Sequence, residues 1–206
     1  MKALHVLAAA VVVAAVGIYG LRAQAQNGPA SAPARKPAPG FTLTDQKGNT
    51  VKLSDFKGKV VVLEWTNPDC PFVQRHYKAG TMAMLAKAYA PRGVVWLAIN
   101  TTYYMDRAKD ADWAAKQQIA YPVLGDHDGK AGKAYGAKSS PHMFVIDANG
   151  NIAYQGAIDN DANGEKKEGA VNYVALALDA VLAGKPVAIP ATKPYGCSVK
   201  YPPEPK

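Results

Sequence analysis

The chain has only two cysteines among its 206 residues, and they lie far apart in the sequence. Cys70 stands within the stretch EWTNPDCPFVQRHY, where positions 67 and 73 are Asn and Val, so neither neighbour at C-x-x-C spacing is a cysteine. The second cysteine, Cys197, follows 127 positions later. The usual local disulfide is therefore excluded, and any partner for Cys70 must come from the far end of the chain.

Charge is also sparse, since charged residues make up only 19% of the chain and hydrophobic residues 49%. This composition excludes a disordered polyelectrolyte and allows one well-buried domain with tails. The formal charge is +8, but the lysines are scattered and no basic run is interleaved with aromatics, so no nucleic-acid partner is expected. There are no internal repeats, which excludes solenoids and propellers.

The N-terminus has the pattern of a targeting segment. Lys2 precedes a long apolar run, and AQA at positions 23–25 fits a small-x-small cleavage site. We expect a cleavable signal peptide over residues 1–25 and a periplasmic or secreted protein. An uncleaved membrane anchor is the alternative, because the run is about long enough to span a bilayer. In an oxidising compartment two cysteines can pair and stay paired.

Composition divides the remainder into three parts. Residues 26–39 form a Pro/Ala-rich linker, residues 40–190 the folded domain, and residues 191–206 a Pro-rich, Cys-containing tail. Apolar runs and turn residues predict strands at 41–44, 50–53, 59–65, 93–100, 142–147 and 151–158. Helical patterns begin at Pro71 and run to Ala88, then cover 106–120, 129–136 and 169–184. In the second of these, the residues expected to face inward are Ala108, Ala111, Trp113, Ala115 and Ile119. This order predicts an α/β domain with a mixed sheet flanked by helices.

Cys70 follows a predicted buried strand and precedes a predicted helix. Unpaired N–H groups and the helix dipole at such a position favour a thiolate, which is the nucleophilic form of cysteine. Arg75 and His76 add positive potential in the following turns, and Asp69 opposes it. The position indicates a reactive thiol rather than a packing residue.

Two further residues are candidates for the same site. Glu64 lies within an apolar strand, where burial raises a carboxyl pKa and suits it to proton transfer; pairing with a nearby Lys is the alternative. Pro141 stands directly before a core strand in SSPHMF, where either a cis bond or an ordinary trans turn is compatible with the sequence.

The stretches LSDFKGKVVVLEWTNPDCPF and YPVLGDHDGKAGKAYGAKSSPHMFVIDANGNIAYQGAID resemble the thioredoxin superfamily. More narrowly they resemble exported redoxins of the alkyl hydroperoxide reductase and thiol-specific antioxidant family, over about residues 41–184. The resemblance implies a thioredoxin-like fold with an N-terminal hairpin extension and an irregular C-terminal tail. It also implies Cys70 as the attacking cysteine, Glu64 as a buried acid that moves protons, and Pro141 as the cis-proline beside the sulfur. It implies no organic cofactor.

The departures from the family pattern matter for the choice of substrate. Val73 replaces the second cysteine of the C-x-x-C pair. A peroxiredoxin-type site would carry Thr or Ser at position 67, where this chain has Asn67, with Thr66 adjacent. Such a site also uses an arginine, for which Arg75 and Arg107 are the candidates.

The sequence allows three interpretations of Cys197. It is a mobile resolving thiol, a structural partner of Cys70, or an unpaired thiol. The third applies if the two cysteines lie too far apart, since a disulfide requires Cα atoms about 4.4–6.8 Å apart. A permanent bridge over so long a loop would contribute about 4–5 kcal/mol in the loop-entropy model. A copper site using Cys70 and His76, with His127 or His142, is disfavoured because no C-x-x-x-C motif is present.

We therefore expect an exported thiol-dependent oxidoreductase or antioxidant in which Cys70 is the nucleophile and Cys197 resolves, without cofactor or metal. Expected partners are a thiol or disulfide protein, or a small hydroperoxide, and a membrane-bound or soluble thiol reductant. One alternative is a peroxiredoxin-like thiol peroxidase. Another is a redox-inactive binding module with a structural Cys70–Cys197 disulfide.

Overall fold

The computed structural model describes residues 35–166 and 168–204. The expected signal peptide, residues 1–25, lies outside the described residues. Within the described part of the chain, no helix is both long enough and apolar enough to cross a bilayer. Residues 35–39 run beside the β-hairpin that ends the sheet, where Pro37 bridges to Asn151.

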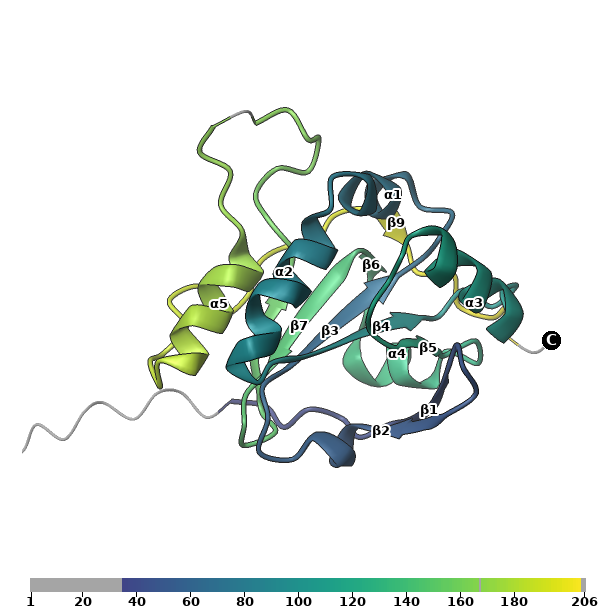
Figure 1. Ribbon diagram of the computed structural model, residues 1–206, viewed down its shortest axis with the longest axis horizontal. Helices are drawn as coiled ribbons and strands as arrows, with labels where there is room; N and C mark the ends of the chain where they lie inside the picture. The colour runs from purple at the N-terminus through teal and green to yellow at the C-terminus, as the bar shows by residue number, and fades with distance from the viewer. Residues whose placement is uncertain (1–34, 167, 205–206) are drawn as a thin grey trace, which may run out of the picture. The chain divides into compact units, whose positions relative to one another are not determined.

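A mixed sheet forms the centre of the fold, as the sequence predicts, and it has seven strands (Figure 1). Its spatial order is β2-β1-β5-β4-β3-β7-β8. The central strands β3, β4 and β5 are parallel, and β7, β8, β1 and β2 pair antiparallel. The strands are β1 (Thr42–Asp45), β2 (Thr50–Lys52), β3 (Val61–Thr66), β4 (Val95–Asn100), β5 (Val123–Gly125), β7 (His142–Ile146) and β8 (Ile152–Gly156).

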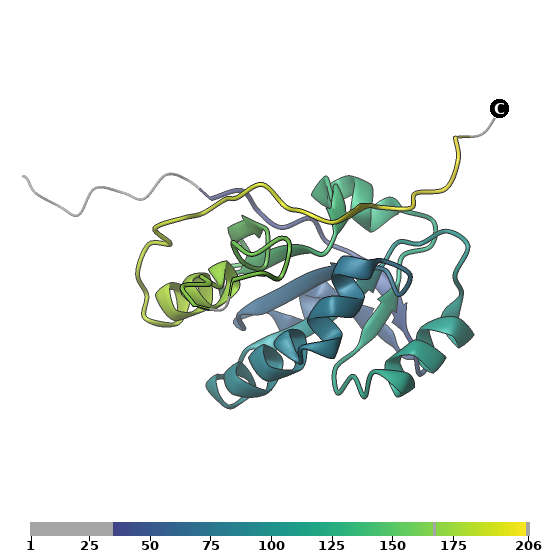
Figure 2. The ribbon, with the colours of Figure 1, turned by 90° about the horizontal axis from the view of Figure 1, so that it is seen from above.

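Helices cover both faces of the sheet because its central strands are apolar on both sides. Val62 and Trp96 pack toward α2 and α5 on one face, while Leu63 and Trp65 pack toward α4 on the other. Figure 2 shows α4 across the sheet from α1 and α2. The helices are α1 (Pro71–Lys78), α2 (Thr81–Tyr89), α3 (Arg107–Lys116), α4 (Lys130–Tyr135) and α5 (Tyr173–Leu182), with 3₁₀ turns at Leu53–Phe56 and Ala90–Arg92.

The helical run predicted from Pro71 to Ala88 is divided in two. Gly80 adopts φ +71° between α1 and α2, a left-handed conformation that glycine takes without steric cost. The break allows α2 to change direction and pack on the sheet, while α1 stays at the carboxyl ends of β3 and β4 (Figure 1).

The inward face of α3 also differs from the expectation. Ala108 and Ala115 are exposed, whereas Asp110 is buried with Trp113 and Ala114. A carboxylate takes this position because polar groups on neighbouring loops hold it.

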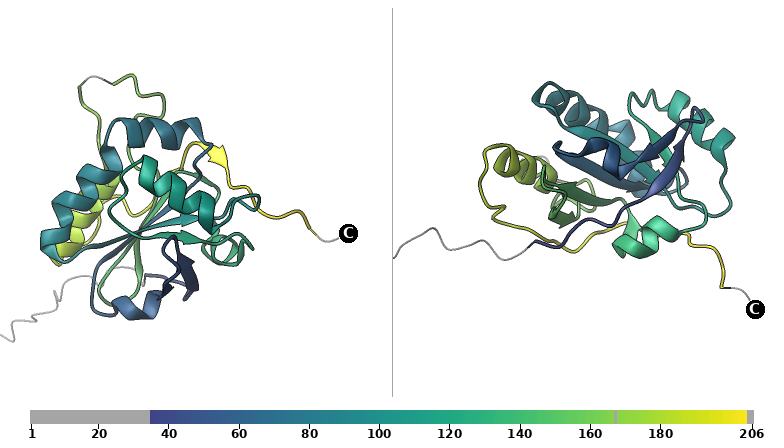
Figure 3. Two further views of the ribbon diagram at one scale, coloured as in Figure 1. Left: turned by 45° about the vertical axis from the view of Figure 1, so that its right-hand side comes forward. Right: turned by 90° about the horizontal axis from the view of Figure 1, so that it is seen from below.

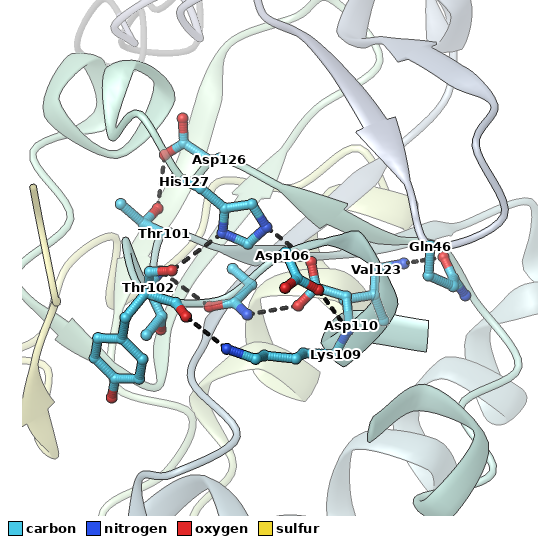
Figure 4. A network of polar contacts seen from close by, with 11 residues as sticks. Gln46, Thr101, Thr102, Asp106, Lys109, Asp110, Val123, Asp126 and His127 are labelled. Carbon is cyan, nitrogen blue, oxygen red and sulfur yellow. Dashed lines mark hydrogen bonds and ion pairs between the residues drawn. The ribbon is translucent and has the colours of Figure 1, made fainter. Parts of the chain in front are cut away.

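Asp110 belongs to a polar network between α3 and the loops after β4 and β5 (Figure 4). Asn100 Nδ2 donates to Asp110 Oδ1 at 2.6 Å, and His127 Nε2 lies 3.1 Å from Asp110 Oδ2. His127 Nδ1 lies 3.1 Å from the carbonyl oxygen of Thr102. Both ring nitrogens face acceptors, so the imidazolium form satisfies both contacts. The hydrogen bond to Asp110 accordingly raises the pKa of His127.

This network predicts a pH-dependent contribution to stability. A histidine whose pKa is raised by folding stabilises the protein fully below its unfolded pKa, and this contribution is lost as pH rises through the folded pKa. His127→Gln should lower the free energy of unfolding by about 1 kcal/mol near pH 6, with a smaller difference at alkaline pH. Urea titrations of both proteins between pH 5.5 and 9 measure this difference. A difference that stays constant over that range would contradict the assignment.

Candidate active site

Cys70 lies at the junction that the sequence indicates. It follows β3 as the N-cap residue of α1, with Pro71 opening the helix. Its backbone N–H donates to the carbonyl oxygen of Asn67 at 3.0 Å, which closes the turn between strand and helix. The side chain is 1% exposed, and its thiol donates to the carbonyl oxygen of Ser140 with an S···O distance of 3.0 Å.

That carbonyl belongs to the peptide bond preceding Pro141, which is cis. The short strand β6 (Ser139–Ser140) leads into this bond, and β7 follows it directly. The sequence left the cis and trans forms open. The structure places the cis peptide beside the Cys70 sulfur, and Pro141 is buried there.

Cys197 lies at the same place. It opens the two-residue strand β9 (Cys197–Ser198), which pairs antiparallel with β6 so that Cys197 is opposite Ser140 (Figure 1). Both thiols are free, and Cys197 packs against the buried cluster that contains Cys70. Burial, followed by the proximity of Cys70, raises the pKa of Cys197 to about 11. The fold thus brings together two cysteines separated by most of the domain.

Gly196 permits this close approach. Its φ is +122°, and a Cβ atom at this position would overlap the carbonyl oxygen of Ser140. Only glycine avoids both the unfavourable backbone conformation and the overlap. The tail backbone can therefore lie directly on the β6 strand.

The tail beyond Cys197 is docked rather than projecting from the domain. Tyr201 donates its hydroxyl to the carbonyl oxygen of Ala137 at 2.8 Å. Its ring fills the space that Cβ atoms would occupy at Gly129 and Gly132. Figures 2 and 3 show the tail running along the domain, with β9 beside α1. The sequence favoured a mobile Cys197 that moves in to resolve Cys70. In this structure both thiols are free, and Cys197 already lies against Cys70.

Glu64 is fully buried on β3, in a cage of aromatic donors. Tyr77 Oη donates to Oε1 at 2.8 Å, and Trp96 Nε1 donates to Oε2 at 2.9 Å. Tyr121 Oη donates to Oε2 at 3.3 Å. Burial raises the pKa of Glu64, and the three hydrogen bonds partly offset the shift. The alternative of pairing with a lysine is wrong, because the partners of this carboxyl are aromatic side chains.

Glu64 lies on the same face of the sheet as Cys70. It is paired in register with Ala98 of β4, which packs in one cluster with Cys70, Val73 and Tyr77. Tyr77 is thus in contact with both the Glu64 carboxyl and the cluster around the sulfur. Sequence reasoning missed this cage, although Val73 and Tyr77 follow Cys70 at the three- and seven-residue spacing of one helical face.

The residues considered for peroxide binding take other roles. Asn67 Oδ1 accepts the backbone N–H of Asp69 at 2.9 Å, so this side chain shapes the turn before Cys70. Arg75 donates to the carbonyl oxygen of Asp161 at 3.0 Å. Arg107 lies near Gly48 in the turn between β1 and β2.

Thr66 is the exception. Its hydroxyl is the one buried side-chain polar atom among the described residues that has no hydrogen-bond partner. It lies two residues after Glu64 on β3, and therefore on the same face of the sheet.

The three histidines that the structure describes lie in separate surroundings rather than in a common site. His76 Nε2 is 2.8 Å from Tyr195 Oη, and His142 Nδ1 accepts the backbone N–H of Lys138 at 3.2 Å. Burial lowers the pKa of His142 to about 4. Over residues 35–166 and 168–204, no group of three or more His, Cys, Asp or Glu side chains is arranged to hold a metal ion.

Two tyrosines border the site on the solvent side. Tyr103 and Tyr104 follow β4, are 49% and 42% exposed, and meet edge to face with ring centroids 5.2 Å apart. Tyr104 Oη donates to Asp69 Oδ2 at 3.0 Å, immediately before Cys70. The backbone N–H of Tyr103 donates to the carbonyl oxygen of Lys200 in the tail.

Comparison with known proteins places this arrangement in a family. A model described as the AhpC/TSA family matches residues 34–155. The chain is 31% identical over 122 residues to the thiol-disulfide oxidoreductase ResA of Bacillus thuringiensis subsp. konkukian, covering 57% of this chain and 65% of that protein. It is 30% identical over 132 residues to the chloroplastic peroxiredoxin Q of Triticum aestivum, covering 56% and 55%.

A crystal structure of a hypothetical protein from Sinorhizobium meliloti 1021 superposes with a TM-score of 0.73 and 26% identity, covering 84% of this chain and 97% of that one. The match to ResA thus spans less than two thirds of the length of ResA. The match to the Sinorhizobium meliloti structure extends over nearly all of that protein.

The cage around Glu64 generates a prediction. Tyr77→Phe removes a hydrogen bond that stabilises the carboxylate, so the pKa of Glu64 should rise further and the free energy of unfolding should fall by about 1 kcal/mol. A ¹³C NMR titration of the Glu64 side-chain carboxyl measures the first effect, and urea unfolding measures the second. Tyr89→Phe is the matched control, because Tyr89 donates to the carbonyl oxygen of Ala175 elsewhere in the domain. A Glu64 titration unchanged by Tyr77→Phe would contradict the assignment.

Proposed function

This chain belongs to the AhpC/TSA family, and we propose that within it the protein is a thiol-disulfide oxidoreductase with Cys70 and Cys197 as its redox pair. The observation that carries the proposal is the β6–β9 pairing, which sets Cys197 opposite Ser140, the residue whose carbonyl oxygen accepts the hydrogen bond from the buried Cys70 thiol. The similarity to ResA, which is named a thiol-disulfide oxidoreductase, also supports thiol-disulfide exchange.

The reaction takes place in two exchanges. The Cys70 thiolate attacks one sulfur of a substrate disulfide, forms a mixed disulfide and releases the first substrate thiolate. The Cys197 thiolate then attacks Cys70, forms the Cys70–Cys197 disulfide and releases the second substrate thiolate. The protein pair loses two electrons and the substrate gains them, so turnover requires an external dithiol or thiol reductant.

Cys70 and Cys197 have different roles because their surroundings differ. Cys70 stands at the N-terminus of α1, beside the Ser140 carbonyl oxygen and the cis peptide bond before Pro141. Cys197, with its pKa raised to about 11, remains a thiol near neutral pH and must lose its proton before it attacks. We propose that Glu64, whose pKa is raised by burial, takes part in this proton transfer.

Pro141 has a positioning role in this proposal. The cis peptide before it directs the Ser140 carbonyl oxygen to the Cys70 thiol, and β6 offers its edge to an extended segment. At present the chain's own tail occupies that edge. A substrate protein must therefore displace β9 to reach Cys70, next to the exposed rings of Tyr103 and Tyr104.

Export of the protein is part of the proposal and rests on the N-terminal sequence, in which Lys2 is followed by an apolar run and an AQA motif. In the periplasm or outside the cell, a reversible disulfide requires a dedicated thiol donor, either soluble or bound to the membrane.

A second candidate is a thiol peroxidase that reduces small hydroperoxides. It is favoured by the burial of Cys70, which is 1% exposed, because a small oxidant can reach it with a smaller displacement of the tail than a protein disulfide requires. Cys70 would be oxidised to a sulfenic acid with release of an alcohol or water. Cys197 would then condense with the sulfenic acid to form the disulfide, releasing one water.

Trapping tests the assigned roles of the two cysteines. Reduced wild-type protein mixed with one equivalent of an aromatic disulfide such as dithiobis(nitrobenzoate) should release about two aryl thiolates per protein and gain a Cys70–Cys197 bridge. Cys197→Ser should release about one and keep the aryl adduct on Cys70. Cys70→Ser should react about tenfold more slowly, because burial, the main cause of the raised pKa of Cys197, remains in this variant.

Ser198→Ala, on the same strand, is the matched control and should behave as the wild type. Peptide mapping by mass spectrometry locates the adduct and the bridge. Release of a single aryl thiolate by the wild type, with no bridge, would refute resolution by Cys197.

Hydrogen peroxide separates the two candidate functions. If the protein is a disulfide oxidoreductase, the reduced form should consume peroxide within about tenfold of the rate of a free cysteine. Stopped-flow measurement of peroxide loss gives this rate, with Cys70→Ser as the background. A rate about a thousandfold above free cysteine would instead establish the peroxidase.

A further inference from the structure

Tyr195 joins three separate parts of the chain two residues before Cys197. Its hydroxyl donates to Asp159 Oδ1 at 2.6 Å and lies 2.8 Å from His76 Nε2. Asp159 belongs to the loop after β8, and His76 lies on α1, the helix that Cys70 caps. The redox tail is therefore attached to the helix that carries the other cysteine.

The hydroxyl of Tyr195 has one proton, which is assigned to the shorter contact, that with Asp159 Oδ1. His76 Nε2 faces both the Tyr195 hydroxyl and Arg75 Nη2, which lies 3.3 Å away. Burial lowers the pKa of His76 and favours the neutral ring. Burial and the hydrogen bond to Asp159 raise the pKa of Tyr195, so the hydroxyl stays protonated. The hydroxyl thus has one partner on α1 and one on the loop after β8.

The ring of Tyr195 is held as well as its hydroxyl. Its centroid lies 6.0 Å from that of Phe72 and 6.0 Å from Arg75 Cζ, both on α1. Arg75 in turn donates to the carbonyl oxygen of Asp161. These contacts hold the ring between α1 and the loop after β8, while Gly196 turns the chain so that Cys197 meets Ser140.

We propose that Tyr195 is a positioning residue for Cys197, and that its hydroxyl anchors the tail to α1 and the Asp159 loop so that the Cys197 sulfur faces Cys70. This inference rests on the proposed function of the cysteine pair. It also gives a role to the partly buried cluster of Asp159, Tyr195 and His76, whose tyrosine lies two residues before Cys197 in the tail. Without the hydroxyl, the segment before Cys197 keeps the ring contacts to Phe72 and Arg75 but has no hydrogen bond from Tyr195 to α1 or to the Asp159 loop.

The predicted consequence is a lower effective concentration of Cys197 at Cys70. The exchange of reduced protein with glutathione disulfide gives the bridged protein and two glutathione thiols, and its equilibrium constant measures that concentration. Tyr195→Phe should lower the constant about tenfold, which corresponds to about 30 mV. Asp159→Ala should have a similar effect, and the double variant should add little, because both substitutions break the same hydrogen bond. Tyr89→Phe, which removes a tyrosine hydroxyl bond far from the tail, should leave the constant unchanged.

A second measurement does not depend on redox chemistry. In a Cys70→Ser background, amide hydrogen exchange at residues 195–199 should be about tenfold faster with Tyr195→Phe than without it, while exchange in β3 and β4 stays the same. Equal slowing or acceleration throughout the domain would indicate a general stability effect and would overturn the inference. An equilibrium constant unchanged by Tyr195→Phe would also overturn it.

Failure of the proposed redox pairing can be told apart from failure of the role proposed for Tyr195. If the wild type never forms the Cys70–Cys197 bridge with glutathione, the redox pairing is wrong. The exchange measurement then decides the inference alone: faster exchange confined to the tail supports an anchoring Tyr195, and unchanged exchange overturns it.

Discussion

The pairing of β9 with β6 is the contact on which the candidate site depends. It is only two residues long, yet it brings Cys197 opposite Ser140, whose carbonyl oxygen accepts the hydrogen bond from Cys70. Gly196 allows the two backbones to meet, and the tyrosines at positions 195 and 201 anchor the tail on either side. A ladder this short gains little stability alone, because few hydrogen bonds offset the cost of ordering the chain. The anchors therefore determine whether the two cysteines meet.

This arrangement places a second cysteine beside Cys70 without a C-x-x-C motif. In that motif the helix fixes the distance between the cysteines. Here the distance is fixed by tertiary contacts between segments far apart in the sequence. If the two cysteines form a redox pair, as we propose, the equilibrium between the reduced and bridged forms depends on how firmly the tail is held. Cys70 is 1% exposed with the tail in place, so in that proposal release of the tail would favour substrate access and docking of the tail would favour resolution.

The periodic elements were predictable from the sequence because each carries its own local signal. The buried runs of β3 and β4, the β7–β8 hairpin around Asn149–Gly150, and the junction at Cys70 all lie where the patterns indicate. The break at Gly80 was missed because a single glycine within an apolar helical pattern does not by itself end a helix. The inward position of Asp110 was missed because it depends on Asn100 and His127, on other elements.

The least predictable part of the site is the tail. Two-residue strands have no periodicity, and 119 residues separate His76 from Tyr195. The cage around Glu64 was only partly predictable from the sequence. Tyr77 follows Cys70 on one helical face, whereas Trp96 and Tyr121 come from β4 and from the segment before β5. Sequence patterns identified both cysteines, the acid and the proline as candidates, and the fold determines which of them meet.

The most direct test of the account is the reduction potential of the Cys70–Cys197 couple in the wild-type chain, with peptide mapping of the species present at each potential. The account predicts one two-electron transition between the free thiols and a Cys70–Cys197 bridge, at a potential above about −300 mV, so that cellular thiols can reduce it. A bridge with a potential well below that value would make the disulfide a structural staple. No bridge at any potential would show that the two cysteines do not act together.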